Sequence, residues 1–193
     1  GSQKGLMLPP GMSFNAISNK ALEAYKNSKI PESYFDWGQM LENNKSGFYP
    51  YTPATNLLYG LNESINMLLE EGLDNVFARH KRLADATRLA VEAWGLEILA
   101  KNPIERSDSI TAIMVPDGHD SDNLRKIIYD NYNMSLGTGL NKVKSKVFRI
   151  GHLGDLNDLS LMGALAGVEM GLKQSGIPYK SGGIMAAIDF LSS

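Results

Sequence analysis

Lys4 is the first side chain in this sequence that could carry out a reaction. It stands between Gln3 and Gly5, just before an apolar run that ends in Pro9-Pro10-Gly11. A lysine amine attacks carbonyl carbons and forms imines when desolvation or a neighbouring cation favours its uncharged form. Without such surroundings it is an ordinary solvated amine. Lys4 is therefore a candidate nucleophile whose role depends on what the other candidates bind.

Two hydroxyl side chains, Tyr49 and Thr52, stand just before a helix that is expected from residue 54 onward. Phosphate groups bind well where hydroxyls and free backbone N–H groups meet at the start of a helix. The same stretch is also typical of a proline-punctuated loop in which Thr52 or Thr55 caps the helix. The residues alone allow both interpretations, a phosphate site and a capped loop.

Arg149 lies inside an apolar stretch, Val147–Ile150, that has the composition of a strand. A guanidinium in such a place is costly to bury unless an anion pairs with it. The partner could be an aspartate or glutamate of the chain. It could equally be the carboxylate of a ligand, which a planar guanidinium binds through two hydrogen bonds.

The remaining candidates carry weaker signals. The three histidines, His80, His119 and His152, lie far apart and show no spacing of metal ligands. The sequence has no cysteine, which excludes disulfides, thiolate metal sites and cysteine nucleophiles. The stretch Gly137–Gly139 lacks the lysine and the spacing of a phosphate-binding P-loop, so turn geometry explains its glycines better.

Composition sets the broad class. The 193 residues are 43% hydrophobic and 21% charged with a net charge of −2, which is ordinary for a globular protein and gives no reason to expect nucleic acid or an anionic membrane as a partner. No apolar run approaches the roughly 20 residues that span a bilayer, and no signal-peptide pattern is present. We therefore expect a cytoplasmic protein with one sizeable domain or a domain with an appendage.

The elements that must position these candidates follow from periodicity and capping residues. Residues 1–54 hold five of the eight prolines, and two short helices are expected there, at Ser18–Asn27 with Ser18 as the cap and at Asp36–Asn44. An apolar helical face predicts a helix from residue 54 to Gly72, and a longer helix follows to Gly95. The residues on these helical faces are Leu57, Leu58, Leu61, Ile65, Leu68 and Leu69 in the first helix, then Leu73, Val76, Phe77, His80, Leu83, Thr87, Ala90, Val91 and Trp94 in the second.

Beyond Asn102-Pro103 the pattern changes to that of strands alternating with helices. Strands are expected at Ser109–Val115, Met134–Leu136 and Lys146–Ile150, and helices from Asp120 or Ser121 to Tyr132, from a cap at Asp155 to Gln174, and at Ile184–Leu191. This order predicts an α/β (α+β) fold with a small mixed or antiparallel sheet covered by helices on one face. A long helix and an extended N-terminal segment precede it.

Several of these segments together resemble one family. Ser2-Gln3-Lys4 with the run to Pro9-Pro10-Gly11, Tyr34-Phe35-Asp36-Trp37, the Tyr49–Thr55 loop and Arg149-Ile150-Gly151 resemble the C-terminal half of a fold-type I pyridoxal-phosphate (PLP) aminotransferase of the serine–glyoxylate (alanine–glyoxylate) family. The resemblance extends over essentially all 193 residues.

The resemblance implies a role for each candidate. Lys4 would hold the aldehyde of PLP as an imine and move the substrate's α-proton. Gln3 would contact the cofactor phosphate, and Tyr49 with Thr52 would reach the phosphate in the neighbouring subunit of a homodimer. Arg149 would bind the α-carboxylate of the substrate. The implied reaction moves an amino group from serine (or alanine) to glyoxylate and gives hydroxypyruvate (or pyruvate) and glycine.

The resemblance also implies a division of the chain. Residues 1–54 would be the tail of the large PLP-binding domain, 55–100 connecting long helices, and 101–193 the small C-terminal α+β domain. In that family the N-terminal half supplies the ring that stacks on the cofactor, the aspartate at the pyridine nitrogen and the main phosphate loop. The isolated chain is therefore expected to be incomplete and inactive without a partner half.

One alternative from another class stays open, a noncatalytic module that dimerises or binds a partner. That module predicts a solvent-exposed Lys4, with Tyr49, Thr52 and Arg149 pointing apart. The enzyme predicts that Lys4 and Arg149 face one cleft. A cysteine desulfurase is disfavoured because its reaction needs a cysteine.

Overall fold

The computed structural model describes residues 1–193, which divide into two units, Gly1–Met67 and Leu68–Ser193. The first unit contains α1 (Asn19–Lys26), the 3-10 helix η1 (Ser33–Phe35), α2 (Trp37–Asn44) and most of α3 (Thr55–Glu71). Each unit is described by itself.

The two short helices of the first unit begin where they were expected, and each has an N-cap side chain, Ser18 as predicted and Asp36. The Ser18 side chain accepts from the Ala21 amide, and the Asp36 side chain accepts from the Gln39 amide. The Tyr25 hydroxyl donates to Asp36 Oδ1 at 2.6 Å and so joins the two helices. Neither helix buries a residue. Capping and local hydrogen bonds, rather than a core, therefore define this part of the chain.

The second unit contains four whole α-helices, two 3-10 helices and four strands. Its elements in order are α4 (Leu73–Ala93), β1 (Glu97–Ile98), η2 (Pro103–Glu105), β2 (Ile110–Met114), α5 (Ser121–Tyr132), β3 (Gly137–Thr138), η3 (Asn141–Val143), β4 (Val147–Gly151), α6 (Asp158–Ser175) and α7 (Gly183–Leu191).

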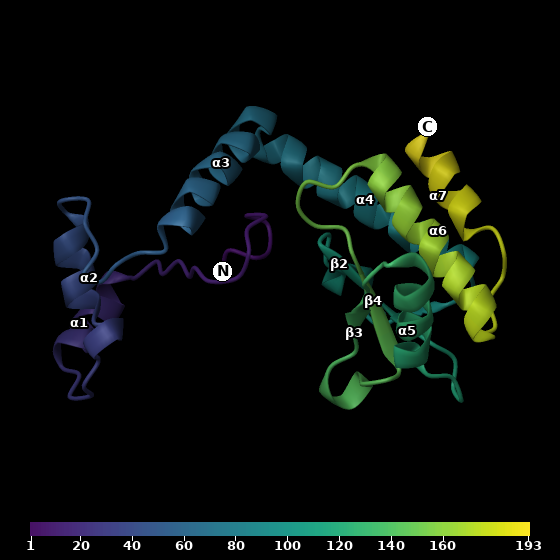
Figure 1. The fold of residues 1–193 in the computed structure, drawn as a ribbon, viewed down its shortest axis with the longest axis horizontal. Coiled ribbons are helices and arrows are strands. Elements are labelled where there is room, and N and C mark those ends of the chain that lie inside the picture. The colour runs from purple at the N-terminus through teal and green to yellow at the C-terminus, as the bar shows by residue number, and fades with distance from the viewer. The chain divides into compact units, whose positions relative to one another are not determined.

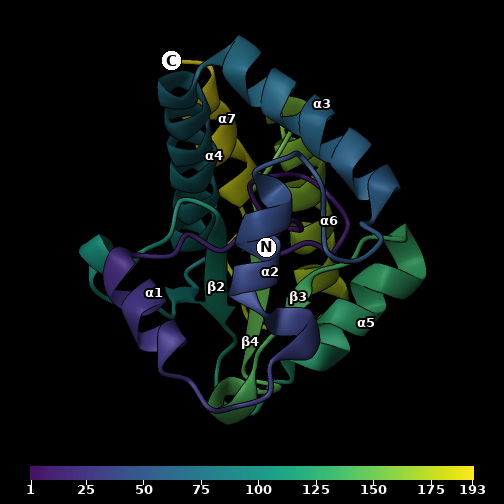
Figure 2. The same cartoon turned by 90° about the vertical axis from the view of Figure 1, so that its left-hand side faces the viewer.

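The four strands form one antiparallel sheet in the order β1-β2-β4-β3, and Figures 1 and 2 show β2, β4 and β3 side by side. Side chains alternate between the two faces of a strand. In β4, Phe148 and Ile150 are fully buried and join a core with residues of α4, α5, α6 and α7. Arg149 points to the other face. The sheet is thus covered by helices on one face, which confirms the predicted fold class.

Three boundaries differ from the sequence-based expectation. The strand expected at Met134–Leu136 lies instead at Gly137–Thr138, because these two residues pair with Arg149 and Phe148 while the Leu136 side chain packs into the core. The first strand, β1, was not expected. Helix α6 is capped by Asn157, whose side chain accepts from the Ser160 amide at 2.9 Å, and not by Asp155.

The apolar faces of α3 and α4 differ in burial. In α4, Leu83, Ala90 and Val91 are fully buried, whereas Phe77 is 63% exposed. In α3, Ser64 is the only buried residue. None of the helices is long and apolar enough to cross a membrane.

Candidate functional site

Lys4 lies in a tight turn of the first unit. The Met7 amide donates to the Lys4 carbonyl at 2.8 Å, and Met7 itself adopts a left-handed conformation with φ of 57°. The Lys4 side chain is exposed and takes part in no hydrogen bond or ion pair within the chain. Its amine is free to meet a group that comes from outside this unit.

The buried Ser2 closes the turn that carries Lys4. Its hydroxyl donates to the Pro9 carbonyl at 2.7 Å and accepts from the Met12 amide at 3.3 Å. Its backbone N–H donates to the Met12 carbonyl at 3.2 Å, and its carbonyl accepts from the Leu8 amide at 3.1 Å. Four hydrogen bonds to one residue hold the two ends of the loop together, so the Lys4 backbone has little freedom.

The loop is also attached to α3. The Ser64 hydroxyl donates to the Leu6 carbonyl at 2.6 Å. The Leu8 side chain lies so close to Gly60 that a Cβ there would be 2.7 Å from Leu8 Cδ2. A hydrogen bond and a close packing contact therefore fix the Lys4 turn to a 17-residue helix.

Gln3 stands next to Lys4 but makes no hydrogen bond within the chain. Its exposed side chain bends back over Gly1, where a Cβ would be 2.8 Å from Gln3 Oε1. The Gln3 amide group is therefore available to an external partner.

Tyr49 and Thr52 are exposed in the loop before α3. Neither Thr52 nor Thr55 caps the helix, since neither hydroxyl accepts from a backbone amide. The Thr55 amide donates to the Pro53 carbonyl, and the Leu58 amide donates to the Ala54 carbonyl. The amides of Asn56 and Leu57 have no acceptor. Free hydroxyls in the loop and free amides at the following helix start are the kinds of donor that a phosphate binds.

Arg149 is held in β4 between two small residues. It pairs with Ala112 of β2 on one side and Gly137 of β3 on the other. Its Nε donates to the Thr138 carbonyl at 2.9 Å, and it is absent from the ion pairs that other arginines form. A structural carboxylate as its partner is therefore the wrong alternative. The two terminal nitrogens remain free, which is the geometry that binds a carboxylate through two hydrogen bonds.

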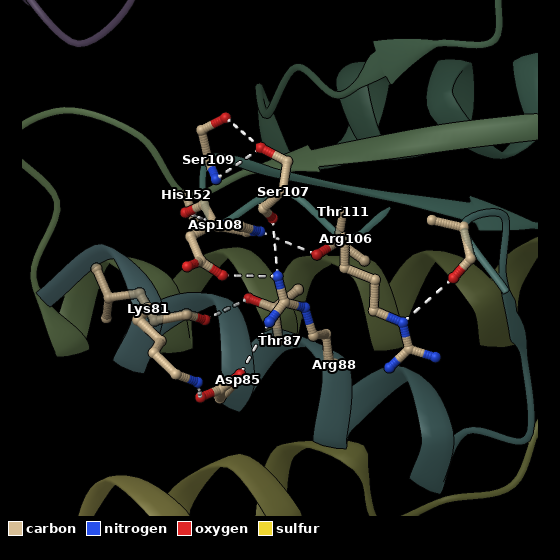
Figure 3. A network of polar contacts seen from close by, with 12 residues as sticks. Lys81, Asp85, Thr87, Arg88, Arg106, Ser107, Asp108, Ser109, Thr111 and His152 are labelled. Atoms are coloured by element: carbon tan, nitrogen blue, oxygen red, sulfur yellow. Dashed lines mark hydrogen bonds and ion pairs between the residues drawn. The ribbon is translucent and has the colours of Figure 1, made fainter. Parts of the chain in front are cut away.

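His152 points to the opposite side of the sheet from Arg149. Its Nδ1 lies 3.0 Å from the Asp108 carbonyl and its Nε2 lies 2.9 Å from Thr111 Oγ1, so both ring nitrogens are occupied (Figure 3). Burial lowers the pKa of His152 below its ordinary value of 6.5, against the opposing effect of the Asp108 carbonyl. A neutral, fully hydrogen-bonded imidazole is a structural group.

His80 has a similar role on α4. Its Nδ1 lies 2.7 Å from the Val76 carbonyl, and its Nε2 accepts from the Gly154 amide at 3.0 Å. The ring joins the helix to the loop that follows β4.

Sequence reasoning missed two residues whose hydrogen bonds hold the Lys4 turn, Ser2 and Ser64. Ser64 carried a usable signal, because it interrupts the apolar face of α3 that runs through Leu61 and Leu68. A polar residue on such a face has to find a partner. Ser2 gave no such signal, because its hydrogen bonds to Pro9 and Met12 exist only once the turn has formed.

Comparisons with known proteins find glyoxylate aminotransferases that are similar to this chain. The chain is 50% identical over 197 aligned residues to the serine–glyoxylate aminotransferase of Methylorubrum extorquens, covering 99% of this chain and 49% of that protein. It is 46% identical to the L-aspartate–glyoxylate aminotransferase of Paracoccus denitrificans, covering 97% of this chain and 47% of that protein. No protein-family model matches.

A solved structure agrees with these relatives. The ureidoglycine–glyoxylate aminotransferase of Bacillus subtilis superimposes with a TM-score of 0.88 at 27% identity, covering 100% of this chain and 51% of that chain. The chain thus spans about half the length of the curated relatives and of the solved structure that it matches.

Proposed function

Since this chain is a homologue of the serine–glyoxylate aminotransferases that matches about half of their length, we propose that it is the C-terminal portion of a PLP-dependent transaminase. The proposed enzyme moves an amino group from serine (or alanine) to glyoxylate and gives hydroxypyruvate (or pyruvate) and glycine. The observation that carries this proposal is Lys4, an amine without a partner on a turn that four hydrogen bonds close.

The donor groups of the first unit fit PLP, a phosphate ester that carries an aldehyde. Lys4 offers an unpaired amine to the aldehyde. Tyr49, Thr52 and the free amides at the start of α3 offer hydrogen bonds to a phosphate, and Gln3 offers its side-chain amide. When bound, the cofactor supplies an electron sink that stabilises negative charge at the substrate's α-carbon.

The chain's own residues would do three things. The Lys4 amine would hold the cofactor covalently at rest and, when released, carry the proton of the substrate's α-carbon. Arg149 would bind the α-carboxylate through its two free terminal nitrogens. The turn closed by Ser2 and fixed by Ser64 would keep the Lys4 amine in place between these steps.

The acceptor is better supported than the donor. The three proteins compared above all have glyoxylate in their names, whereas the named donors are serine, aspartate and ureidoglycine. A carboxylate clamp such as Arg149 is common to all of these substrates and selects none. Serine as the donor rests on identities of 50–51% to three serine–glyoxylate aminotransferases.

The proposal needs partners. The ring that stacks on the cofactor and its further phosphate contacts would come from a half that this chain does not contain. The exposed aromatic side chains Phe35, Phe48 and Tyr49, which are 49–74% exposed, support a surface that another chain or domain covers. We propose a homodimer in which Tyr49 and Thr52 serve the neighbouring subunit's phosphate site. The cytoplasmic location stays a prediction.

The test compares Lys4→Ala with Lys20→Ala in the complete enzyme, this chain joined to its other half. Lys20 is an exposed lysine at the start of α1 and serves as the matched control. Lys4→Ala is expected to abolish glycine formation from serine and glyoxylate, and also the mass increase that borohydride leaves on a lysine bound to PLP. Lys20→Ala should keep both. Unchanged glycine formation by Lys4→Ala would overturn the proposal and favour the noncatalytic module.

The isolated 193-residue chain is expected to give no turnover under the same conditions. Transamination by the isolated chain would contradict the need for a second half.

A further inference from the structure

The orientation of Arg149 depends on a very short strand. The single hydrogen bond of its side chain within the chain goes to the carbonyl of Thr138, and β3 consists of Gly137 and Thr138 alone. Two residues at the edge of a sheet form few ladder hydrogen bonds, so the ladder alone fixes this carbonyl weakly. Another contact has to hold the strand if the guanidinium is to keep one direction.

Asp122, at the start of α5, supplies that contact. Its Oδ1 accepts from Thr138 Oγ1 at 2.9 Å, and its Oδ2 accepts from Ser145 Oγ at 2.9 Å. Thr138 and Ser145 lie on either side of the connection between β3 and β4. One carboxylate therefore joins both ends of that connection to the helix, which lies beside the strands (Figures 1 and 2).

Arg125, one helical turn further on, supports the same carboxylate. Its Nη1 donates to Asp122 Oδ1 at 2.8 Å, and its Nε donates to the Leu136 carbonyl at 2.8 Å, directly before β3. Burial raises the pKa of Asp122, but the hydrogen bonds from Thr138, Ser145 and Arg125 outweigh it and leave the pKa below its usual value. The acceptor is thus an ionised carboxylate at neutral pH, and charged acceptors form the stronger hydrogen bonds.

The backbone of β3 also leaves room for the arginine. A Cβ on Gly137 would stand 3.0 Å from both Cβ and Nε of Arg149. The side chain of Arg149 therefore passes directly over Gly137 on its way to the Thr138 carbonyl, and a shift of this strand would displace the guanidinium.

We infer that Asp122 is a positioning residue for substrate binding, because it holds Thr138 in the place where the Thr138 carbonyl directs the guanidinium of Arg149. The inference rests on the proposed function, in which Arg149 binds the α-carboxylate. Asp122 itself touches neither Arg149 nor a substrate. It sets the direction of the two free nitrogens of Arg149.

The experiment uses the complete holoenzyme and two substitutions, Asp122→Asn and Thr138→Val. Thr138→Val keeps the Thr138 carbonyl and removes the hydroxyl that donates to Asp122. It therefore tests the same hydrogen bond if Asp122→Asn fails to fold. The matched control is Asp130→Asn, the same change on the same helix at an exposed aspartate that pairs only with Lys126. Folding of each variant is checked by its thermal midpoint.

Each variant is assayed with serine and with serinamide, which lacks the carboxylate. Both test variants should raise KM for serine on the order of tenfold, the factor that corresponds to weakening one hydrogen bond, with kcat within about twofold. KM for serinamide should not change. In a second measurement, on the complete enzyme after removal of its cofactor, the affinity for glyoxylate determined by calorimetry should fall by a similar factor. The control should match the unmodified enzyme throughout.

Arg149→Lys separates failure of the inference from failure of the proposed function. Suppose that Arg149→Lys raises KM for serine. If both test variants then leave KM for serine unchanged, or raise KM for serine and serinamide equally, Asp122 has no positioning role and the inference is overturned. If Arg149→Lys leaves the ratio of the two KM values unchanged, Arg149 does not bind the carboxylate. The proposed role of Arg149 then fails, and the inference fails with it.

Discussion

The two units of this chain are built in opposite ways. Every buried hydrophobic residue lies in the second unit, where 20 of them form one continuous cluster. In the first unit the only buried residues are two serines, Ser2 and Ser64, and both are hydrogen-bonded to the segment around Lys4. Apolar burial is the main stabilising term in folding, so the second unit has what it needs to fold and the first does not.

This contrast indicates which of the two units depends on another domain or subunit for its stability. The first unit holds its catalytic candidate by hydrogen bonds on a helix whose apolar side chains are exposed, such as Tyr59 at 80% and Ile65 at 41%. A surface of this kind is stable when another domain or subunit covers it. The second unit presents Arg149 on a sheet that its own core already supports.

The largest expected effect is on hydrogen exchange of the isolated chain. Amides in α4 and α6 should exchange on the order of a thousandfold more slowly than amides in α1 and α2, because opening the former exposes the core and opening the latter exposes no buried residue. Mass spectrometry of the peptic peptides measures this. Equal protection of α1 and α6 would contradict the contrast between the units.

The next largest effect is on the free energy of unfolding, compared between one leucine of each unit. Leu165→Ala removes a fully buried side chain of α6 and should lower the free energy of unfolding by about 2–5 kcal/mol. Leu41→Ala, at a side chain of α2 that is 43% exposed, should change it by about 0.5 kcal/mol or less. Urea unfolding followed by circular dichroism gives both values, and a loss at Leu41 as large as that at Leu165 would show a core in the first unit.

A smaller effect concerns the Lys4 turn. Ser64→Ala removes the hydrogen bond to the Leu6 carbonyl, worth about 1 kcal/mol, and should weaken PLP retention by the complete enzyme several-fold. Ser46→Ala, an exposed serine that bonds only to the nearby Asn43 carbonyl, is the control. Retention is measured by dialysis and absorbance. If the two variants lose PLP equally, Ser64 does not hold the turn.

The smallest effect is a pH dependence of the second unit. Because the pKa of His152 is lower in the folded state, the unfolded state binds more protons below pH 6.5. The stability that the buried neutral His152 contributes is therefore fully present above pH 6.5 and is lost as the pH falls toward the lower pKa of His152 in the folded state. The thermal midpoint of the unmodified chain should drop more between pH 7.5 and 5.5 than that of His152→Gln. His119→Gln, a loop histidine, should keep the full drop.

Much of the fold could be predicted because its signals are local. The cap Ser18, the glycine stop at Gly72 and the apolar periods predicted helices that the structure confirms within a few residues. The strand at Gly137–Thr138 and the cap Asn157 could not be predicted. A strand of two residues is defined by its partner in β4, and the sequence analysis placed the cap of α6 at Asp155, two residues before the cap that the structure shows.

The candidate site likewise consists of residues that the sequence indicates and of contacts that only the structure shows. Lys4, Tyr49, Thr52 and Arg149 could be identified because their types and neighbours resemble one family. Their roles in binding PLP and the substrate stay predictions. The contacts that hold them, Ser2 with Pro9 and Met12, Ser64 with Leu6, and Asp122 with Thr138, became visible only in the folded chain.

By itself the sequence determined most of the helices, the helix-covered sheet and the resemblance to one aminotransferase family, since local periodicity, capping and a shared motif suffice for these. Only the tertiary structure decided which polar groups are paired. It left the terminal nitrogens of Arg149 free and gave both nitrogens of His152 a partner, although the two residues stand three apart in one segment. The physical reason is that hydrogen bonds between distant residues depend on the packing of whole elements, which no local pattern encodes.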